Sequence, residues 1–431
     1  MKQKINNKVR ISSGGEATVL GELGTGGQGI VYRVSYYDKE YALKWYHKPG
    51  KPEFYSNLKQ NIEKGSPASQ FLWPLFLTET DKDGCYGYLM ELRDPAYKEF
   101  SDFLLAKVQF ASVEAMVEAG VNICIGFRRL HNLGYSYQDL NDGNFFINPQ
   151  NGDVLICDND NVAPHGVNTG ILGKCRYMAP EVVTRKSEPN AQSDRFSLGI
   201  ILFMLLFGNH PLEGEKIANI ACMTEKNERI LYGSKPTFIY DPHDATNRPV
   251  RGIHDNVLSL WPQYPSFVHD IFVTQFGKEV LKNPSLRITE KEWLHRLLIP
   301  LRHDLIRCPS CKHEIFAHIT DQPIVTCDDC GFVMRRPPLI QSGNFRVATC
   351  AGKKIFSYIT DSHSTDALEC TAVVVESAKT PGLLGLRNQT SSQWLLTTRK
   401  GNCYKIEPQK TAPMLVGNII SCNNGTTIKI I

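Results

Sequence analysis

The sequence predicts an α+β fold in which a small β-rich lobe precedes a larger helical lobe. Between about residues 15 and 92, short apolar segments alternate with polar residues and are separated by glycines, as is typical of strands. Beyond this region the apolar spacing becomes helical, and the chain later contains paired cysteines and a second strand-like region. We therefore expect two lobes, over 1–92 and 93–300, and two smaller domains, over 301–337 and 338–431.

The composition indicates a protein of a reducing compartment. A formal net charge of +4 over 431 residues implies no strongly basic face, so nucleic-acid binding gains no support. The longest apolar run, Phe196–Phe207, is too short to span a bilayer, and the first residues lack the apolar core of a signal peptide. Most of the 13 cysteines are scattered singly through apolar segments, which favours buried thiols over a disulfide framework. We expect a cytoplasmic protein without a membrane segment.

The individual elements of the two lobes follow from the same apolar periodicity. Strands are expected at Ala17–Leu20, Ile30–Val34, Glu40–Trp45 and Tyr86–Met90, and helices at Phe54–Lys64, Val113–His131 and Ser193–Leu206.

A glycine-rich turn and a lysine form the first part of the predicted site. Gly24, Gly26 and Gly29 have the spacing G-x-G-x-x-G between two predicted strands, which favours a hairpin over phosphates rather than a dinucleotide-binding turn. Lys44 lies in a strand and matches the last position of the Val-Ala-Ile-Lys pattern, where a lysine holds the α- and β-phosphates. Its alternative role is that of a solubilising edge-strand lysine. Glu63, on the next helix, is the candidate counter-ion of Lys44, and its alternative is a solvated surface glutamate.

An aspartate and an asparagine form the second part. Asp139 and Asn144 keep the spacing of the protein-kinase pattern His-Arg-Asp-Leu-x-x-x-Asn. Tyr137, Gln138 and Asn141 stand in place of its histidine, arginine and downstream lysine. The segment resembles a kinase catalytic loop, in which the aspartate accepts the substrate hydroxyl proton and the asparagine binds a metal ion.

A further carboxylate follows the next predicted strand. Asp158 lies fourteen residues after Asn144, where the aspartate of Asp-Phe-Gly belongs. Carboxylate and amide oxygens suit Mg²⁺ or Mn²⁺. Asp158 is the predicted metal ligand, and Asp160 is the alternative because Asn159 and Asp160 replace the Phe-Gly pair.

Later motifs extend the resemblance to eukaryotic-type (Hanks-like) serine/threonine protein kinases over about residues 15–300. They are Gly173–Glu181, which ends in Ala-Pro-Glu, Asp194–Gly199, His210-Pro211 and Asn283–Arg287. The resemblance implies a bilobal protein-kinase fold and a buried, structural ion pair between Glu181 and Arg287.

The same resemblance assigns the residues around the adenine ring of ATP. Met90, Glu91 and Leu92 end a strand where a kinase has its gatekeeper and hinge, whose backbone groups meet adenine. Val31 and Ala42 are expected to cover the faces of the ring.

Two departures from the kinase pattern concern regulation and rate. Gln138 cannot neutralise a phosphate dianion as the usual arginine does, so activity is not expected to depend strongly on phosphorylation of the activation loop. Asn141 replaces the lysine near the γ-phosphate, a loss worth roughly 2–4 kcal/mol of barrier. Because Asp139 and the metal positions remain, a slow kinase is favoured over an inactive one.

Two Cys-x-x-Cys pairs predict a zinc ribbon. Cys308 and Cys311 precede Cys327 and Cys330 by fifteen residues, a spacing typical of a tetrahedral four-thiolate site for Zn²⁺. Closed sites of this kind are structural. A zinc ribbon can bind nucleic acid or brace neighbouring domains, and the lack of a dense basic patch favours bracing or protein contact.

The region from about residue 340 is expected to be an all-β domain similar to forkhead-associated sandwiches, although the motifs that those domains use on phosphothreonine are not evident. Its expected strands include Phe345–Thr349, Thr371–Val375, Trp394–Thr398 and Thr427–Ile430. The kinase, Leu72-Trp-Pro74, Asp158-Asn-Asp160 and the zinc ribbon together resemble bacterial kinases of the TerY-type phosphorylation triad. That resemblance implies a PP2C-like phosphatase and a von Willebrand-type domain protein as partners.

We therefore predict an ATP- and Mg²⁺-dependent serine/threonine protein kinase that acts on protein substrates, with tail modules that bind partners. One alternative is a nucleotide-binding pseudokinase scaffold with little or no transferase activity. The other is a small-molecule kinase of the same fold, against which the Ala-Pro-Glu segment argues.

Overall fold

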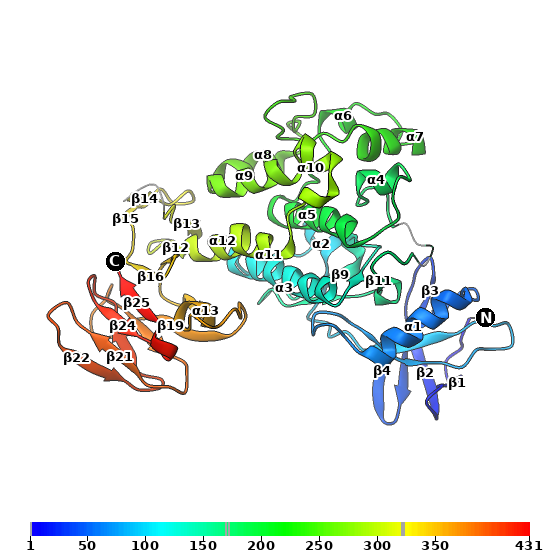
Figure 1. Ribbon diagram of the computed structural model, residues 1–431, viewed down its shortest axis with the longest axis horizontal. Helices are drawn as coiled ribbons and strands as arrows, with labels where there is room; N and C mark the ends of the chain where they lie inside the picture. The colour runs from blue at the N-terminus through cyan, green and yellow to red at the C-terminus, as the bar shows by residue number, and fades with distance from the viewer. Residues whose placement is uncertain (1, 169, 171–172, 320–323) are drawn as a thin grey trace. The chain divides into compact units, whose positions relative to one another are not determined.

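The computed structural model describes residues 2–168, 170, 173–319 and 324–431. The chain forms two compact units, Met1–Leu297 and Leu298–Ile431 (Figure 1). The first contains a β-rich part followed by helices, and the second contains several antiparallel sheets, so the predicted α+β class is confirmed. The finer division into four domains stays a prediction.

A six-stranded antiparallel sheet of order β1-β2-β3-β4-β6-β5 opens the first unit. Its elements are β1 (Lys8–Arg10), β2 (Glu16–Thr25), β3 (Gly29–Tyr36), β4 (Lys39–Tyr46), α1 (Pro52–Lys64), β5 (Pro74–Leu77) and β6 (Gly87–Glu91). The four expected strands and the expected helix are all present. Helix α1 begins with proline at its first position, where the ring's fixed φ suits a helix, and it ends at Gly65, whose φ is 78°.

Lys44 lies in an inner strand of this sheet. It pairs with Val31 of β3 on one side and with Tyr88 of β6 on the other. Ala42 and Tyr46 enter the apolar cluster that also contains residues of α1. Because alternate residues of a strand share a face, Lys44 points to the same side as Ala42 and Tyr46, which α1 covers. The strand of Lys44 is paired on both sides, so the alternative role of an edge-strand lysine is excluded.

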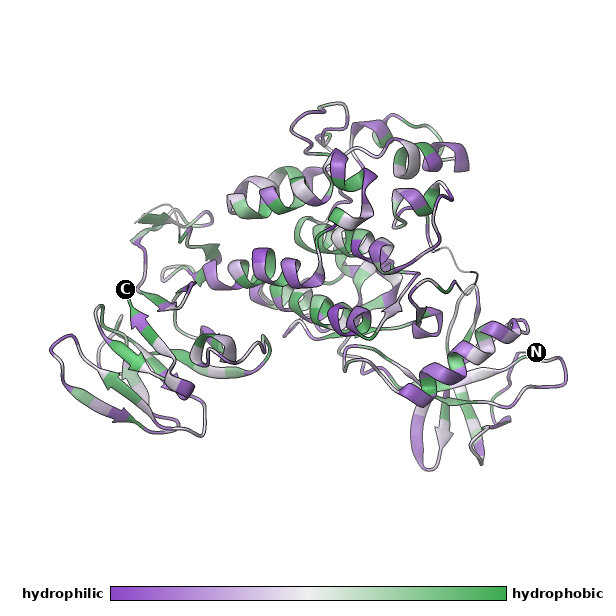
Figure 2. Cartoon of the chain, viewed as in Figure 1, coloured by the Kyte–Doolittle hydropathy of each residue, from purple (hydrophilic) through white to green (hydrophobic). Residues whose placement is uncertain are grey.

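Helix α5 (Ala191–Phe207) forms the core of the helical part. It begins at Asn190 with a capping box to Ser193, and it ends at Gly208, whose φ is 65°. After a polar first turn its residues are almost all apolar (Figure 2), and nearly all are buried, which confirms the prediction of a buried helix. Among the described residues, a helix with the length and apolarity of a membrane span does not occur.

Further helices precede and follow α5 along the chain. They are α2 (Phe100–Leu104), α3 (Val113–Asn132), α4 (Pro180–Val183), α6 (Glu215–Ala218), α7 (Glu225–Glu228), α8 (Asp255–Leu260), α9 (Ser266–Gln275), α10 (Lys278–Lys282) and α11 (Glu290–Trp293). Short strands carry the loops of the site: β7 (Lys98–Glu99), β8 (Tyr135–Ser136), β9 (Phe145–Ile147), β10 (Val154–Ile156) and β11 (Ala163–Pro164).

The expected ion pair between Glu181 and Arg287 is confirmed. Both guanidinium Nη atoms donate to the carboxylate at 2.7 Å, and Nη1 also donates to the carbonyl oxygen of Gln192 at 2.9 Å. The Arg287 side chain is fully buried. A bidentate pair of this kind anchors the Ala-Pro-Glu segment to the helical part.

The second unit begins with α12 (Ile299–Asp304) and two β-hairpins, β12 (Leu305–Arg307) with β13 (Glu314–Phe316) and β14 (Ile324–Thr326) with β15 (Val333–Arg335). A six-stranded sheet of order β17-β16-β25-β24-β21-β22 and a four-stranded sheet of order β18-β19-β20-β23 follow.

The elements of these two sheets are β16 (Leu339–Ser342), β17 (Phe345–Ala348), β18 (Lys354–Phe356), α13 (Ser357–Thr360), β19 (Cys370–Glu376), β20 (Leu384–Asn388), β21 (Trp394–Thr397), β22 (Cys403–Ile406), β23 (Thr411–Pro413), β24 (Ile419–Ser421) and β25 (Thr427–Ile430). The strands expected near residues 345, 371, 394 and 427 are therefore confirmed. The similarity to forkhead-associated domains stays a prediction.

Candidate functional site

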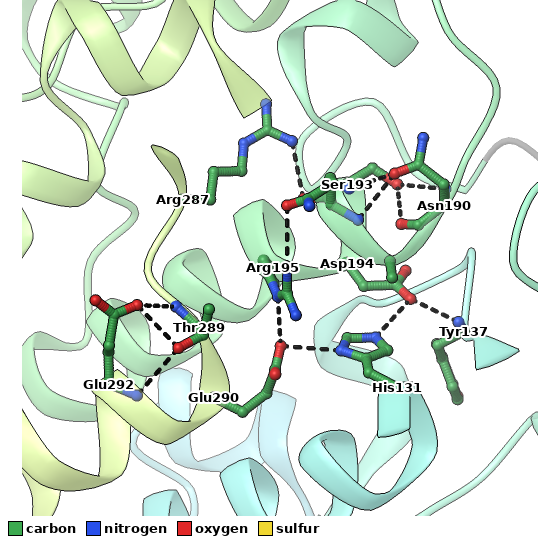
Figure 3. A network of polar contacts seen from close by, with 12 residues as sticks. His131, Tyr137, Asn190, Ser193, Asp194, Arg195, Arg287, Thr289, Glu290 and Glu292 are labelled. Carbon is green, nitrogen blue, oxygen red and sulfur yellow. Dashed lines mark hydrogen bonds and ion pairs between the residues drawn. The ribbon is translucent and has the colours of Figure 1, made fainter. Parts of the chain in front are cut away.

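Asp194, at the start of α5, positions the predicted catalytic loop (Figure 3). Its carboxylate accepts hydrogen bonds from the backbone N–H of Tyr137 at 2.6 Å and from that of Gln138 at 3.0 Å. Gln138 has a φ of 73°, a left-handed conformation that is unfavourable for a non-glycine residue. The two bonds to one buried carboxylate hold the backbone that leads into Asp139.

A buried histidine balances the charge of Asp194. His131 of α3 contacts Asp194 through Nε2 at 3.1 Å and Glu290 through Nδ1 at 2.9 Å, and Arg195 Nε reaches Glu290 at 3.0 Å. Burial alone would lower the pKa of His131, but hydrogen bonds to the two carboxylates raise it to about 9. His131 is therefore a cation at neutral pH, and two cations face two carboxylates (Figure 3).

Asp139 is a partly desolvated carboxylate with a neutral neighbour. Burial raises its pKa to about 6, against the opposing hydrogen bond from Asn141. Asn141 Nδ2 lies 3.1 Å from Asp139 Oδ1, and Asn141 Oδ1 accepts the N–H of Gly143 at 3.1 Å. Asn141 therefore orients the carboxylate while it caps the short helical turn Asp142–Asn144.

Asn144 and Asp158 lie next to each other behind the loop. Asn144 Nδ2 donates to the carbonyl oxygen of Asp139 at 2.6 Å, which leaves its amide oxygen as the end available to a cation. The Asn144 carbonyl accepts the N–H of Cys157 at 2.9 Å, directly before Asp158. The Asp158 side chain is 43 % exposed, and its backbone is left-handed with a φ of 54°. The backbone bond between Asn144 and Cys157 therefore brings the chain segments of the two predicted metal ligands together.

Lys44 reaches both carboxylates that follow β10. Its Nζ lies 2.9 Å and 3.1 Å from the two carboxylate oxygens of Asp160 and 3.2 Å from Asp158 Oδ1. Burial alone would lower the pKa of Lys44, but the charges of Asp160 and Asp158 outweigh it and raise the pKa above its usual value. The predicted phosphate lysine is therefore a buried, fully charged ammonium group.

The structure does not bring Glu63 to Lys44. Asn57, Leu58 and Asn61 form the buried face of α1, whereas Glu63 is exposed. At 3.6 residues per turn, Glu63 lies about 200° around the helix from Asn61. The predicted pairing is wrong in this structure, because the packing of α1 places Glu63 in solvent.

The predicted phosphate hairpin is present between β2 and β3. A side chain at Gly29 would come within 2.4 Å of the Trp45 carbonyl oxygen, so close backbone packing requires glycine there. A Cβ at Gly24 would meet nothing within 4 Å, and one at Gly26 only the Gly29 carbonyl at 3.9 Å. These two exposed glycines leave open space beside the hairpin, which is the room that a phosphate chain needs.

The predicted adenine-lining residues share one apolar cluster. Ala42 and Met90 are buried members of it, and Val31 and Leu92 pack against it together with Cys157. Cys157 was not predicted, although it directly precedes Asp158. Glu91 stays at the surface, where it forms an ion pair with Lys39 at 2.8 Å.

Gln138 and Lys174 connect the catalytic loop to the activation segment. Gln138 Nε2 donates to the carbonyl oxygen of Val167 at 2.5 Å, so a neutral hydrogen bond holds this part of the segment. Lys174 lies 3.5 Å from Asp142 Oδ1, and its charge acts to lower the pKa of Asp139. The sequence analysis missed Lys174, although its place directly after Gly173 in the Ala-Pro-Glu segment was a signal.

The four ribbon cysteines converge in the second unit. Cys308 and Cys311 lie in the turn from β12 to β13, and Cys327 and Cys330 lie in the turn from β14 to β15. All four Sγ atoms lie within 4.8 Å of one another.

The sulfur separations fit a tetrahedral metal site. Cys308 and Cys330 Sγ are 3.7 Å apart, and Cys311 and Cys327 Sγ are 3.6 Å apart. A tetrahedral zinc with Zn–S bonds of about 2.3 Å would give an S···S separation of about 3.8 Å. The four thiols could therefore hold one Zn²⁺ ion.

Known proteins resemble this chain over most of its length. Protein kinase YegI of Escherichia coli K12 is 26 % identical over 393 residues, which cover 85 % of this chain and 57 % of YegI. The YegI protein of Escherichia coli O157:H7 is 25 % identical over 82 % of this chain and 56 % of its own length. The chain therefore spans somewhat more than half the length of these relatives.

Eukaryotic kinases match shorter stretches. Human ribosomal protein S6 kinase alpha-4 is 32 % identical over 145 residues, which cover 32 % of this chain and 18 % of that kinase. The protein kinase domain family matches residues 17–296, the region that contains the phosphate hairpin, Lys44 and the catalytic loop. Since this match covers more than half of the 431 residues, the chain belongs to the protein kinase domain family.

Proposed function

We propose that this chain transfers the γ-phosphoryl group of ATP to serine or threonine hydroxyls of protein substrates. The observation that carries the proposal is that Lys44, Asp139, Asn144 and Asp158 lie together, and that Lys44 also contacts Gln28 of the glycine hairpin at 3.2 Å. Phosphoryl transfer depends mostly on positioning and electrostatics, and these four residues supply both. A scaffold that only binds nucleotide would not need an oriented, partly desolvated Asp139.

Asn144 and Asp158 would hold the divalent metal ion. Both oxygens of Asp160 already receive hydrogen bonds from Lys44, and one also receives the Tyr46 hydroxyl. Asp158 is more exposed than Asp160, which supports Asp158 over Asp160 as the proposed ligand. Mg²⁺ or Mn²⁺, when bound, supplies charge neutralisation at the phosphates.

Asp139 acts as the base that accepts the proton of the attacking hydroxyl. Its raised pKa of about 6 makes it a better proton acceptor than an ordinary aspartate while it remains ionised near neutral pH. The hydrogen bond from Asn141 selects the orientation of the carboxylate.

Lys174 supplies the cation that Asn141 lacks. Its ammonium group lies beside the turn that Asn141 caps, where a Cβ at Gly143 would be 3.5 Å from Lys174 Nζ. A lysine on the activation segment would therefore stabilise charge on the transferred phosphoryl group. Gln138 holds the same segment through Val167, so no phosphate on the segment is needed to place it.

Zn²⁺ in the four-cysteine cluster would brace the second unit, and this unit would bind partner proteins. The proposal for zinc rests on the four converging thiols. The two predicted partners of the phosphorylation triad stay predictions.

The first test measures transfer directly. The full chain, treated with a phosphatase that is then removed, is incubated with labelled ATP, Mg²⁺ and dephosphorylated casein, alongside Asp139→Ala. We expect label on serine or threonine of casein or of the chain itself with the wild type and none above background with the variant. Binding of ADP with Mg²⁺, measured by calorimetry, is the control for a folded site. Intact binding without transfer would establish the scaffold, and label on tyrosine alone would overturn the assignment to serine and threonine.

The second test concerns pH. Because Asp139 must be ionised to accept a proton, we expect kcat/KM to fall about tenfold per pH unit as the pH drops below about 6. Thermal unfolding at each pH serves as the control for acid denaturation. A profile that stays flat down to pH 4.5 would contradict the role of a base with a raised pKa.

The third test concerns Lys174. Lys174→Met should lower kcat about 10- to 100-fold. This loss is smaller than the loss expected on removing a buried hydrogen-bond donor, because the Lys174 side chain is 59 % exposed and water screens its charge. KM for ATP should change little, and Lys174→Arg should retain most of the activity. The matched control is Lys186→Met, an exposed lysine nearby in the chain, and equal effects of the two substitutions would rule out a specific role.

The fourth test concerns zinc. Purified protein should contain one zinc per chain by atomic emission, and a strong chelator should remove it and lower the melting temperature of the second unit. Cys327→Ser should lose the metal, whereas Cys403→Ser, which changes an exposed thiol outside the cluster, should keep it. Metal-free protein with unchanged unfolding would refute a structural zinc site.

A further inference from the structure

We propose that Asp160, rather than a glutamate of α1, is the counter-ion that positions Lys44 for the phosphates of ATP. This inference rests on the proposed kinase function and names a positioning residue for it. Asp160 does not touch the substrate in this role. It acts by holding the ammonium group of Lys44 at one point of the site.

The contacts of Asp160 are those of a dedicated counter-ion. Its side chain is fully buried, and that of Lys44 is 6 % exposed. Both carboxylate oxygens lie within 3.1 Å of Lys44 Nζ, and Oδ2 also accepts the Tyr46 hydroxyl at 2.5 Å. Because the Asp160 carboxylate is removed from water, loss of Lys44 would leave it as an unpaired buried charge, so the two groups are held together.

The segment that carries Asp160 is itself fixed by asparagine side chains. Asn159 Nδ2 donates to the carbonyl oxygens of Leu72 and Ile156 at 2.9 Å and 2.8 Å. Asn57 and Asn61 of α1 both donate to the carbonyl oxygen of Val162, at 2.7 Å and 2.8 Å. Helix α1 therefore contributes neutral amides that clamp the segment.

The two carboxylates beside Lys44 differ in exposure, so they can have different roles, Asp158 as a metal ligand and Asp160 as a fixed counter-ion. Asp158 is 43 % exposed, so it can turn to a divalent cation. A metal ion would then compete with Lys44 for the charge of Asp158. Asp160 cannot leave in the same way, because it is enclosed and already bonded at both oxygens. Lys44 thus retains one fixed anion whether or not a metal ion is bound.

The test compares Asp160→Asn with Glu63→Gln, which removes the one acidic side chain predicted on α1 for this role. Asp160→Asn should lower kcat/KM for ATP about 100-fold, which is the size of effect that a misplaced catalytic group produces. Glu63→Gln should stay within twofold of the wild type. Thermal unfolding and calorimetric binding of ADP with Mg²⁺ accompany each kinetic measurement.

A double-mutant cycle separates positioning from general damage. If Asp160 acts through Lys44, Asp160→Asn should cause no further loss of activity or of ADP affinity in a Lys44→Met background. The double variant also removes both buried charges, so it should fold even where a single variant is unstable. Additive losses would overturn the inference, as would a large loss with Glu63→Gln and none with Asp160→Asn.

These experiments separate failure of the kinase proposal from failure of the inference about Asp160. A wild type that binds ADP but transfers no phosphate would refute the kinase proposal. The ADP affinities of Asp160→Asn, Glu63→Gln and the double variant would still decide which carboxylate positions Lys44.

Discussion

The buried carboxylate of Asp194 is the contact on which the catalytic loop depends. It accepts two backbone N–H groups that precede Asp139, including that of Gln138 in its unfavourable left-handed conformation. His131 lies against this carboxylate, and hydrogen bonds to Asp194 and Glu290 raise the pKa of its ring, so a buried cation accompanies the buried carboxylates. Glu290 of α11 and His131 of α3 belong to the same group of polar contacts as Asp194. Helices far apart in the sequence therefore determine where the proposed base lies.

Lys44, on the proposed nucleotide side of the site, is likewise a buried charge held by groups of opposite charge. Lys44 comes from a central strand, and it can remain charged in the interior because Asp160 and Asp158 approach it from the segment after β10. The difference in exposure between these two carboxylates separates their proposed tasks, a fixed counter-ion and a metal ligand. In this arrangement α1 stabilises the segment through Asn57 and Asn61 without adding charge.

The sequence could predict those features that depend on neighbouring residues in the chain. The phosphate hairpin and the strand that contains Lys44 are local features of this kind. The Glu181–Arg287 pair is distant in the chain, but two recognisable motifs identify its members. The error at Glu63 has a physical cause: the pattern of α1 predicts a helix, but the side that faces the site depends on packing against residues about 100 positions later. Lys174 was missed for the same reason, since only folding brings the activation segment to the catalytic loop.

The neutral Asn141 has a consequence for how this loop can change. A lysine at position 141 would remove both the bond that orients Asp139 and the cap on Gly143 N–H. It would also place a second ammonium group near Lys174, where like charges repel. If Lys174 supplies the cation as proposed, the two positions can exchange it only together, and Asn141→Lys alone should lower the proposed activity. The catalytic loop alone does not contain the cation proposed to take the place of the usual lysine, because Lys174 lies about 30 residues farther along the chain.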